Sequence, residues 1–279
     1  MKGKKDSGAV IQVMDMLEMM EIAMQMSGLS RLPEDSMVHV AGDSERPLVA
    51  INVGVGEILL ARELGCDGVI AHHPLGISHL NFHSVISRHS EFLSHVGASD
   101  FEQQVRLLAE KSMLSAHTSI YSQVVESALH LRMPLMNIHL PLDEVGRKII
   151  QEKIDESGPR VADVIKSLST LKEFSLSKVN PIVVLGDHDA KRGKTFLAMA
   201  AGTNGGYEIA KKYFQAGIDT LVYMHIDFEE LKKIREDKSL NGKNLLLLGH
   251  EPGDSVGINA YLDEIERHGI KPVTIGILR

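Results

Sequence analysis

The sequence predicts an α/β fold made of two domains. Short apolar runs that suit buried strands alternate along most of the chain with longer segments in which apolar residues recur at helical spacing. The length of 279 residues exceeds one minimal domain and fits two domains of average size. With 43% hydrophobic and 24% charged residues, the composition is that of a globular protein with a sizeable core.

Each expected element follows from its local pattern, and Gly65, for example, closes a helix as a C-cap. The elements expected in the first half are helices at 11–26, 56–64, 101–111 and 121–131 and strands at 47–53, 69–71, 112–117 and 136–140. Those expected in the second half are strands at 181–185, 219–225, 245–248 and 272–278 and helices at 207–215, 228–236 and 255–267. Strand, helix and strand in this order form the unit of a parallel sheet. We place domain 1 at residues 1–145, completed by a terminal strand within 270–279, and domain 2 at residues 146–269.

Charge and cysteine content argue against several classes of function. The net charge is -7 and basic residues cluster only from Lys2 to Lys5, whereas nucleic-acid binding needs a clustered cationic surface. Cys66 is the only cysteine, so an intramolecular disulfide is excluded and a cytoplasmic location is expected. No stretch approaches the roughly 20 apolar residues of a membrane span. The polar segment from Met1 to Val10 lacks the apolar stretch of a signal peptide.

The adjacent histidines His72 and His73 follow the apolar run 69–71 and precede Pro74. Ligands of α/β proteins collect at the carboxyl ends of strands, so this position suggests a site. Neighbouring side chains in extended backbone point to opposite sides. The pair therefore suits one nitrogen for each of two ions, or one for an ion and one for a substrate. A histidine pair in an exposed turn is the alternative, and this segment alone does not decide between the two interpretations.

A second candidate pair is His139, within the strand expected at 136–140, and Asp143, which lies four positions later. If the backbone stays extended, the two side chains lie on one face. An imidazole and a carboxylate side by side suit a metal site, or a carboxylate that supports a metal-binding histidine. A polar stripe that faces solvent would give the same pattern.

The third candidate group follows the apolar run 245–248 and contains His250, Glu251 and Asp254. If a helix begins near Glu251 with Pro252 in its first turn, His250 and Asp254 lie one turn apart and point the same way. Glu251, as a further ligand or base, would point away from that face. Ordinary helix capping by Asp254 is the alternative.

Three apolar strands that all end in metal-ligating side chains are harder to dismiss together than singly. The candidate ligands are His72, His73, Asp143, His250 and Asp254. Two divalent ions need about six to eight protein ligands, so this set leaves positions open, as catalytic sites do. Histidine with carboxylate suits Zn, Fe, Mn or Ni. A further pair, His225 and Asp227, also follows a strand, and we assign it to a turn or cap.

Together these motifs resemble the Nif-three-like family (NGG-one-interacting factor three), also called dinuclear metal-centre proteins, some of which carry the name GTP cyclohydrolase I type two. The motifs that carry the resemblance are His72-His73-Pro74, His139-Leu140-Pro141-Leu142-Asp143, Gly249-His250 with Asp254, and the turn Gly202-Thr203-Asn204-Gly205-Gly206. Their order and rough spacing agree with the family over most of the chain. Two departures stand out: Asp254 replaces the family's glutamate, and the family's early Trp-Asp-Asn-x-Gly element is missing.

The resemblance implies two divalent ions in the cleft between two α/β domains, and a homo-oligomer that is commonly a toroidal hexamer. Carried over by position, the ligands are His72, His73, Asp143, His250 and Asp254, with His139 close by and facing the substrate. We expect a metal-dependent hydrolase of a small substrate, nucleotide-like ones included, in which His139 or Glu251 moves protons. A non-catalytic metal-binding protein, such as a metal chaperone or an oligomeric scaffold, is the alternative.

Overall fold

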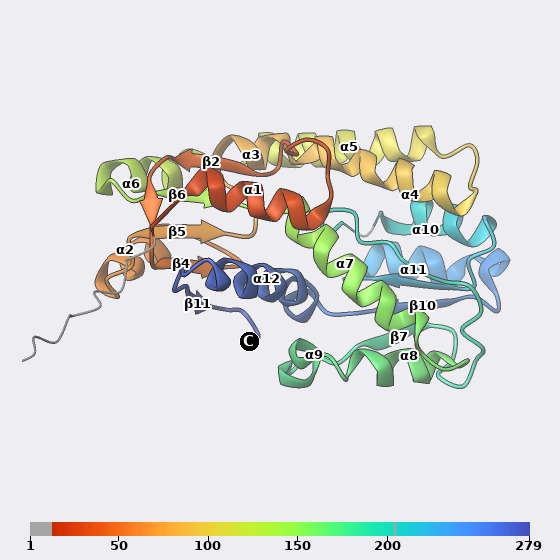
Figure 1. Ribbon diagram of the computed structural model, residues 1–279. Helices are drawn as coiled ribbons and strands as arrows, with labels where there is room; N and C mark the ends of the chain where they lie inside the picture. Colours follow the sequence, from red (N-terminus) through yellow and green to blue (C-terminus); the bar gives the residue numbers. More distant parts are fainter. Residues whose placement is uncertain (1–12, 204) are drawn as a thin grey trace, which may run out of the picture.

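The computed structural model describes residues 13–203 and 205–279, which form two main β-sheets surrounded by helices (Figure 1). The first sheet has five strands in the order β11-β4-β5-β6-β2. Its strands are β2 (Met37–Val40), β4 (Pro47–Ala50), β5 (Gly68–Ala71), β6 (Leu135–Asn137) and β11 (Val273–Ile275). All pairs are parallel except β2 with β6. The last strand of the chain therefore lies in the same sheet as the strands of the first half.

The second sheet has four strands in the order β7-β10-β9-β8. Its strands are β7 (Ile182–Leu185), β8 (Thr195–Leu197), β9 (Thr220–Tyr223) and β10 (Asn244–Leu247). Strands β8, β9 and β10 run parallel and β7 is antiparallel. A short antiparallel pair, β1 (Met14–Asp15) with β3 (Asp43–Ser44), lies apart from both sheets. Parallel strands in both sheets confirm the expected α/β fold.

Helices cover both sheets, and the described residues also form two short 3₁₀ helices. The helices of the first half are α1 (Met16–Ser27), α2 (Val55–Glu63), α3 (Gly76–Leu80), η1 (Asn81–Ser87), α4 (Arg88–Val96), α5 (Glu102–His117), α6 (Gln123–Leu131) and α7 (Leu140–Asp155). Those of the second half are α8 (Val161–Leu168), α9 (Lys172–Leu176), α10 (Gly206–Gln215), α11 (Phe228–Glu236), η2 (Lys238–Leu240) and α12 (His250–Arg267). No helix within the described ranges is long and apolar enough to cross a membrane.

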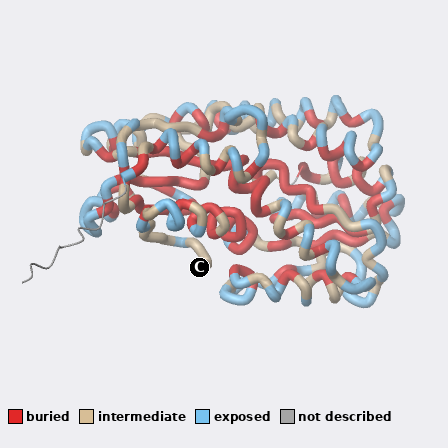
Figure 2. Tube along the Cα trace, in the orientation of Figure 1, coloured by how far each residue is buried: buried red, intermediate tan, exposed pale blue. Residues whose placement is uncertain are grey.

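Helices α7 and α12 pack against each other where the two sheets meet (Figure 1). Gly146 and Gly257 lie at their crossing, and a Cβ on Gly146 would lie 3.0 Å from the backbone nitrogen of Gly257. A Cβ on Gly257 would overlap the carbonyl oxygen of Leu142. Figure 2 shows that buried residues run through this crossing and along both sheets. Only glycine permits such close contact of two helix backbones. The expected domain boundary at residues 145 and 146 lies within α7, and that division stays a prediction.

Several element boundaries differ from those expected. The strand expected at 112–117 is wrong, because this segment lacks glycine and proline and continues α5 as a helix. The strand expected at 136–140 ends at Asn137, since Pro141 starts α7 in its first turn. Helix α1 begins at Met16 behind the capping residue Asp15. Residues 11 and 12 of that expected helix, and the polar start of the chain, lie outside the described residues.

Candidate metal centre

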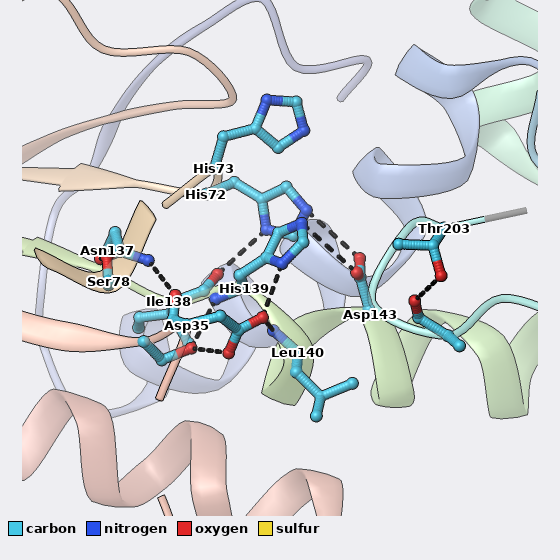
Figure 3. Close-up of polar contacts among 12 residues, drawn as sticks. Asp35, His72, His73, Ser78, Asn137, Ile138, His139, Leu140, Asp143 and Thr203 are labelled. Atoms are coloured by element: carbon cyan, nitrogen blue, oxygen red, sulfur yellow. Dashed lines mark hydrogen bonds and ion pairs between the residues drawn. The ribbon is translucent and has the colours of Figure 1, made fainter. Parts of the chain in front are cut away.

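The candidate residues come from three segments, each of which follows a strand. β5 ends directly before the histidine pair, β6 leads into α7, and β10 of the second sheet leads into α12. The residues that these segments bring together are His72, His73, His139, Asp143, His250 and Asp254. Figure 3 shows the members from the first two segments. The cluster therefore lies at the carboxyl ends of strands from both sheets.

Each of the adjacent histidines donates a hydrogen bond from one ring nitrogen to an acceptor outside the cluster. His72 Nδ1 donates to the carbonyl oxygen of Ile138 at 3.0 Å (Figure 3). His73 Nδ1 donates to Asn52 Oδ1 at 2.7 Å. Because both partners are acceptors, the proton of each neutral ring is on Nδ1. The lone pair of each Nε2 is therefore available to the cluster, which is the arrangement found in metal-ligating histidines.

His139 is held in the same tautomer by a buried carboxylate. Its Nδ1 lies 2.7 Å from Asp35 Oδ2, and the backbone nitrogen of Leu140 donates to the same oxygen (Figure 3). His139 Nε2 faces Asp143 Oδ2 at 3.6 Å. The two side chains lie on one face as expected, but the expected reason, an extended backbone, is wrong. His139 is the N-cap of α7, and a spacing of four residues places the two side chains on one face of a helix.

The two carboxylates are buried in the centre of the cluster. His72 Nε2 lies 3.2 Å from Asp143 Oδ1 and 3.7 Å from Asp254 Oδ1. Asp254 Oδ2 lies 3.3 Å from His73 Nε2 and 3.2 Å from His250 Nε2. Among the described residues, His72 Nε2 and all four carboxylate oxygens are buried without a hydrogen-bond partner. Buried polar atoms without partners are costly, and five of them at one point could together hold a metal ion.

Two groups of ligand-type side chains share one carboxylate. His72, Asp143 and Asp254 each offer one ligand atom within 4.8 Å of the others, and so do His73, His250 and Asp254. The two histidines of the pair thus contact Asp254 from different groups, and together with His139 they form a third group. The oxygens of Asp254 divide between the groups, with Oδ1 toward His72 and Oδ2 toward His73 and His250. The Asp254 side chain thus reaches both groups.

The buried carboxylates also change the pKa values of the imidazoles. Burial alone lowers the pKa of His72, but Asp254 and Asp143 outweigh it and raise that pKa to about 10. The contact with Asp254 raises the pKa of His250, whereas burial lowers the pKa of His73. Burial would raise the pKa of Asp254, but the facing imidazoles, His72 foremost, hold it well below its usual range. The cluster therefore favours positive charge beside two carboxylates.

A cavity of about 680 Å³ borders the cluster. His73, His139 and His250 form one part of its wall, and Gly202 lines another part. Gly202 has a φ of +67°, and a Cβ there would lie 3.7 Å from Asp143 Oδ2 and 3.8 Å from His139 Nε2. Glycine at this position keeps the loop backbone close to the cluster and leaves the space beside it open.

The structure separates Glu251 from the other predicted residues. Glu251 is exposed, and it is absent from the described residues that line the cavity or group as ligands. His225, which we assigned to a turn, lines the cavity with its ring centroid 4.8 Å from that of His250. Sequence reasoning missed Asp35 and Asn52. Each pairs with a histidine that is distant in the sequence, so no local spacing could have indicated them.

Comparisons with known proteins identify relatives among solved structures. No protein-family model matches the chain, and no curated protein matches it. A NIF3 superfamily protein from Sphaerobacter thermophilus is 40% identical, with a TM-score of 0.89 over 94% of this chain and 98% of that chain. Reduced HcgD from Methanocaldococcus jannaschii is 12% identical, with a TM-score of 0.62 over 94% of this chain and 98% of that chain. TTHA1606 from Thermus thermophilus is 16% identical, with a TM-score of 0.53 over 94% of this chain and 97% of that chain. The last two show the fold alone.

The similarity to the Sphaerobacter protein extends over nearly the full length of both chains. It confirms the family that the histidine and aspartate motifs indicated. The chain belongs to the NIF3 superfamily.

Proposed function

We propose that this protein binds two divalent metal ions that share the carboxylate of Asp254. The observation that carries the proposal is the convergence of five buried polar atoms without hydrogen-bond partners among the described residues. The inner position would use His72 and Asp143, and the outer position His73 and His250. Imidazole and carboxylate ligands suit Zn, Fe, Mn or Ni.

The metal content of the purified protein tests this proposal. We expect about two ions per chain after loading and dialysis, measured by elemental analysis. Asp254→Asn removes the shared charge and is expected to lower the content to one ion or none. Asp263→Asn is the matched control, because Asp263 lies on the same helix, is 59% exposed and pairs with Arg279. Two ions retained by Asp254→Asn would contradict a shared carboxylate.

We further propose that the centre hydrolyses a small substrate bound in the adjoining cavity. Two ions there would act as Lewis acids toward a carbonyl or phosphoryl group. His139 lines the cavity, and Asp35 fixes its ring with Nε2 toward the cluster, so that this nitrogen can accept and return a proton. We favour His139 over Glu251 for this role because Glu251 is exposed and away from the cavity.

Turnover separates this proposal from non-catalytic metal binding. We expect the protein loaded with Mn, Fe or Zn to hydrolyse members of a phosphoester and cyclic-amide panel, and His73→Ala to abolish the activity. The alternative of a metal chaperone is favoured by one observation: His250 is 46% exposed, so the outer position is open to exchange. That alternative would be established by full metal occupancy, transfer of the metal to an acceptor, and no hydrolysis of any compound in the panel.

The assembly and location of the protein also remain proposals. We propose a homo-oligomer, a hexamer by the resemblance to the family. Large apolar side chains exposed on α5 and after it, including Leu114, Ile120 and Tyr121, support contacts between copies. Light scattering measures the mass, and a monomer would refute this. We place the protein in the cytoplasm because its only cysteine, Cys66, is a free thiol, as is usual in a reducing compartment.

A further inference from the structure

The cavity beside the cluster has two chemically different walls. One wall carries the imidazoles of His73, His139 and His250. In another part of the wall, η1 and α5 pack together and contribute Phe82 and Leu108. A bound molecule would therefore meet imidazole nitrogens on one part of the wall and hydrocarbon on another.

Phe82 brings the apolar wall directly beside His139. Its ring centroid lies 5.5 Å from that of His139, at an angle of 58° between the ring planes. Phe82 is only partly buried, so part of its ring is open to the cavity. Ile86 and Ala116, both buried, also line the cavity and extend its apolar surface. The first atoms beyond a group held at the cluster would therefore contact an aromatic ring.

The rest of the lining carries little net charge. Apart from histidines, the charged side chains among the described residues of the wall are Lys111 and Asp227, which have opposite signs. A chain of several phosphates would find few cationic partners there beyond the cluster. The volume of about 680 Å³ falls within the roughly 300–1,000 Å³ of small-molecule sites. The cavity therefore suits an uncharged body of one or two rings.

We infer that the substrate is a small molecule with an apolar ring next to a single phosphoryl or carboxyl-derived group. That group faces the metal cluster, and the ring lies against Phe82 and Leu108. The inference rests on the proposed hydrolysis at the metal centre and narrows the substrate class of that reaction. It makes the apolar wall, rather than the metal ligands, the part that selects among substrates.

Two probes with the same head group test the inference. Phenylphosphonate and methylphosphonate offer the same phosphonate to the metals and differ only in the ring. The full chain is loaded with cobalt(II), and each probe is titrated while the visible absorption of the cobalt is followed. We expect phenylphosphonate to bind about tenfold more tightly or better, from burial of the ring.

Variants on both sides of the cavity locate the effect. Phe82→Ala and Leu108→Asn are expected to bring the two dissociation constants close together, and Leu108 is the independent check because it belongs to α5 and not to the element beside His139. Phe228→Ala is the control, since Phe228 is 68% exposed and lies outside the lining. It should keep the preference of the unchanged protein.

The outcomes separate this inference from the proposed function. If the protein takes up cobalt but binds the two probes with equal affinity, the inferred ring-binding site is refuted and the proposed metal centre is not. A preference that persists in both Phe82→Ala and Leu108→Asn also overturns it. Failure to take up cobalt refutes the metal centre, and the inferred substrate class with it.

Discussion

A buried histidine outside the cluster predicts a measurable dependence of stability on pH. His89, in the first turn of α4, is fully buried, and its Nε2 lies 2.8 Å from Thr203 Oγ1. The Thr203 hydroxyl donates to the carbonyl of Ala200, so His89 is the donor in its contact with Thr203. Within the described residues His89 Nδ1 has no partner. Burial lowers the pKa of His89 to about 3.

The sign and size of the effect follow from this pKa. Above pH 6.5, His89 is neutral in the folded and the unfolded protein, and its contribution to stability is fully present. Between pH 6.5 and about 3, the unfolded chain binds a proton that the folded protein does not bind. Each pH unit in that window costs about 1.4 kcal/mol of the free energy of unfolding. At pH 5 the loss from this residue alone is about 2 kcal/mol.

Urea unfolding at pH 7 and pH 5 measures the effect. The neutral variant His89→Gln is expected to lose about 2 kcal/mol less between the two pH values than the unchanged protein. Titration of the histidines in the candidate metal centre is common to both proteins and cancels in this comparison. His130→Gln, at an exposed position on α6, should lose as much as the unchanged protein. An equal loss in His89→Gln would refute the assignment of a neutral buried imidazole.

Three further predictions concern the helix crossing and the metal centre. Gly257→Ala is expected to cost about 1–3 kcal/mol of unfolding free energy, because its Cβ overlaps the Leu142 carbonyl oxygen. Gly56→Ala, in open space on α2, should not destabilise, and equal thermal midpoints for the two variants would contradict the crossing contact. Asp35→Asn removes the carboxylate that orients His139 and should lower the kcat of the proposed hydrolysis about 10–100-fold, with metal content unchanged. An unchanged kcat would show that this orientation is unimportant. Removal of metal by EDTA should lower the thermal midpoint, since each site contributes about 2.7 kcal/mol at a free metal concentration of about 100 times Kd.

Local sequence patterns were sufficient to place a residue at the cluster where its position depends only on its own segment. The histidine pair was found because it follows a short apolar strand, and His250 was found in the same way. The proximity of His139 to Asp143 was predicted from the wrong element. A spacing of four residues places side chains on one face in a strand and in a helix alike, so the conclusion did not depend on the backbone conformation.

Contacts between distant segments could not be predicted in this way. The pairing of Asp35 with His139 joins residues 104 positions apart, and that of Asn52 with His73 spans 21. Periodicity reports only which face of its own element a residue occupies. The tautomers of the histidines depend on these partners, so their orientation toward the cluster required the folded structure. The strand predicted at 112–117 was wrong for a different reason, because a short run with apolar residues fits a strand or a helix equally well.

The glycine crossing of α7 and α12 has a consequence for the choice of metal. Asp143 precedes Gly146 by three residues, and Asp254 precedes Gly257 by the same number. Each carboxylate therefore lies about one helical turn from a point where the two backbones touch. Backbone contact has no rotamers through which to relax, so the separation of the two helices that carry the carboxylates resists expansion. At the proposed metal centre, we expect such a rigid gap to suit ions with short bonds of about 2.0–2.2 Å to oxygen and nitrogen. We expect it to disfavour calcium, whose bonds of about 2.3–2.6 Å would force the helices apart.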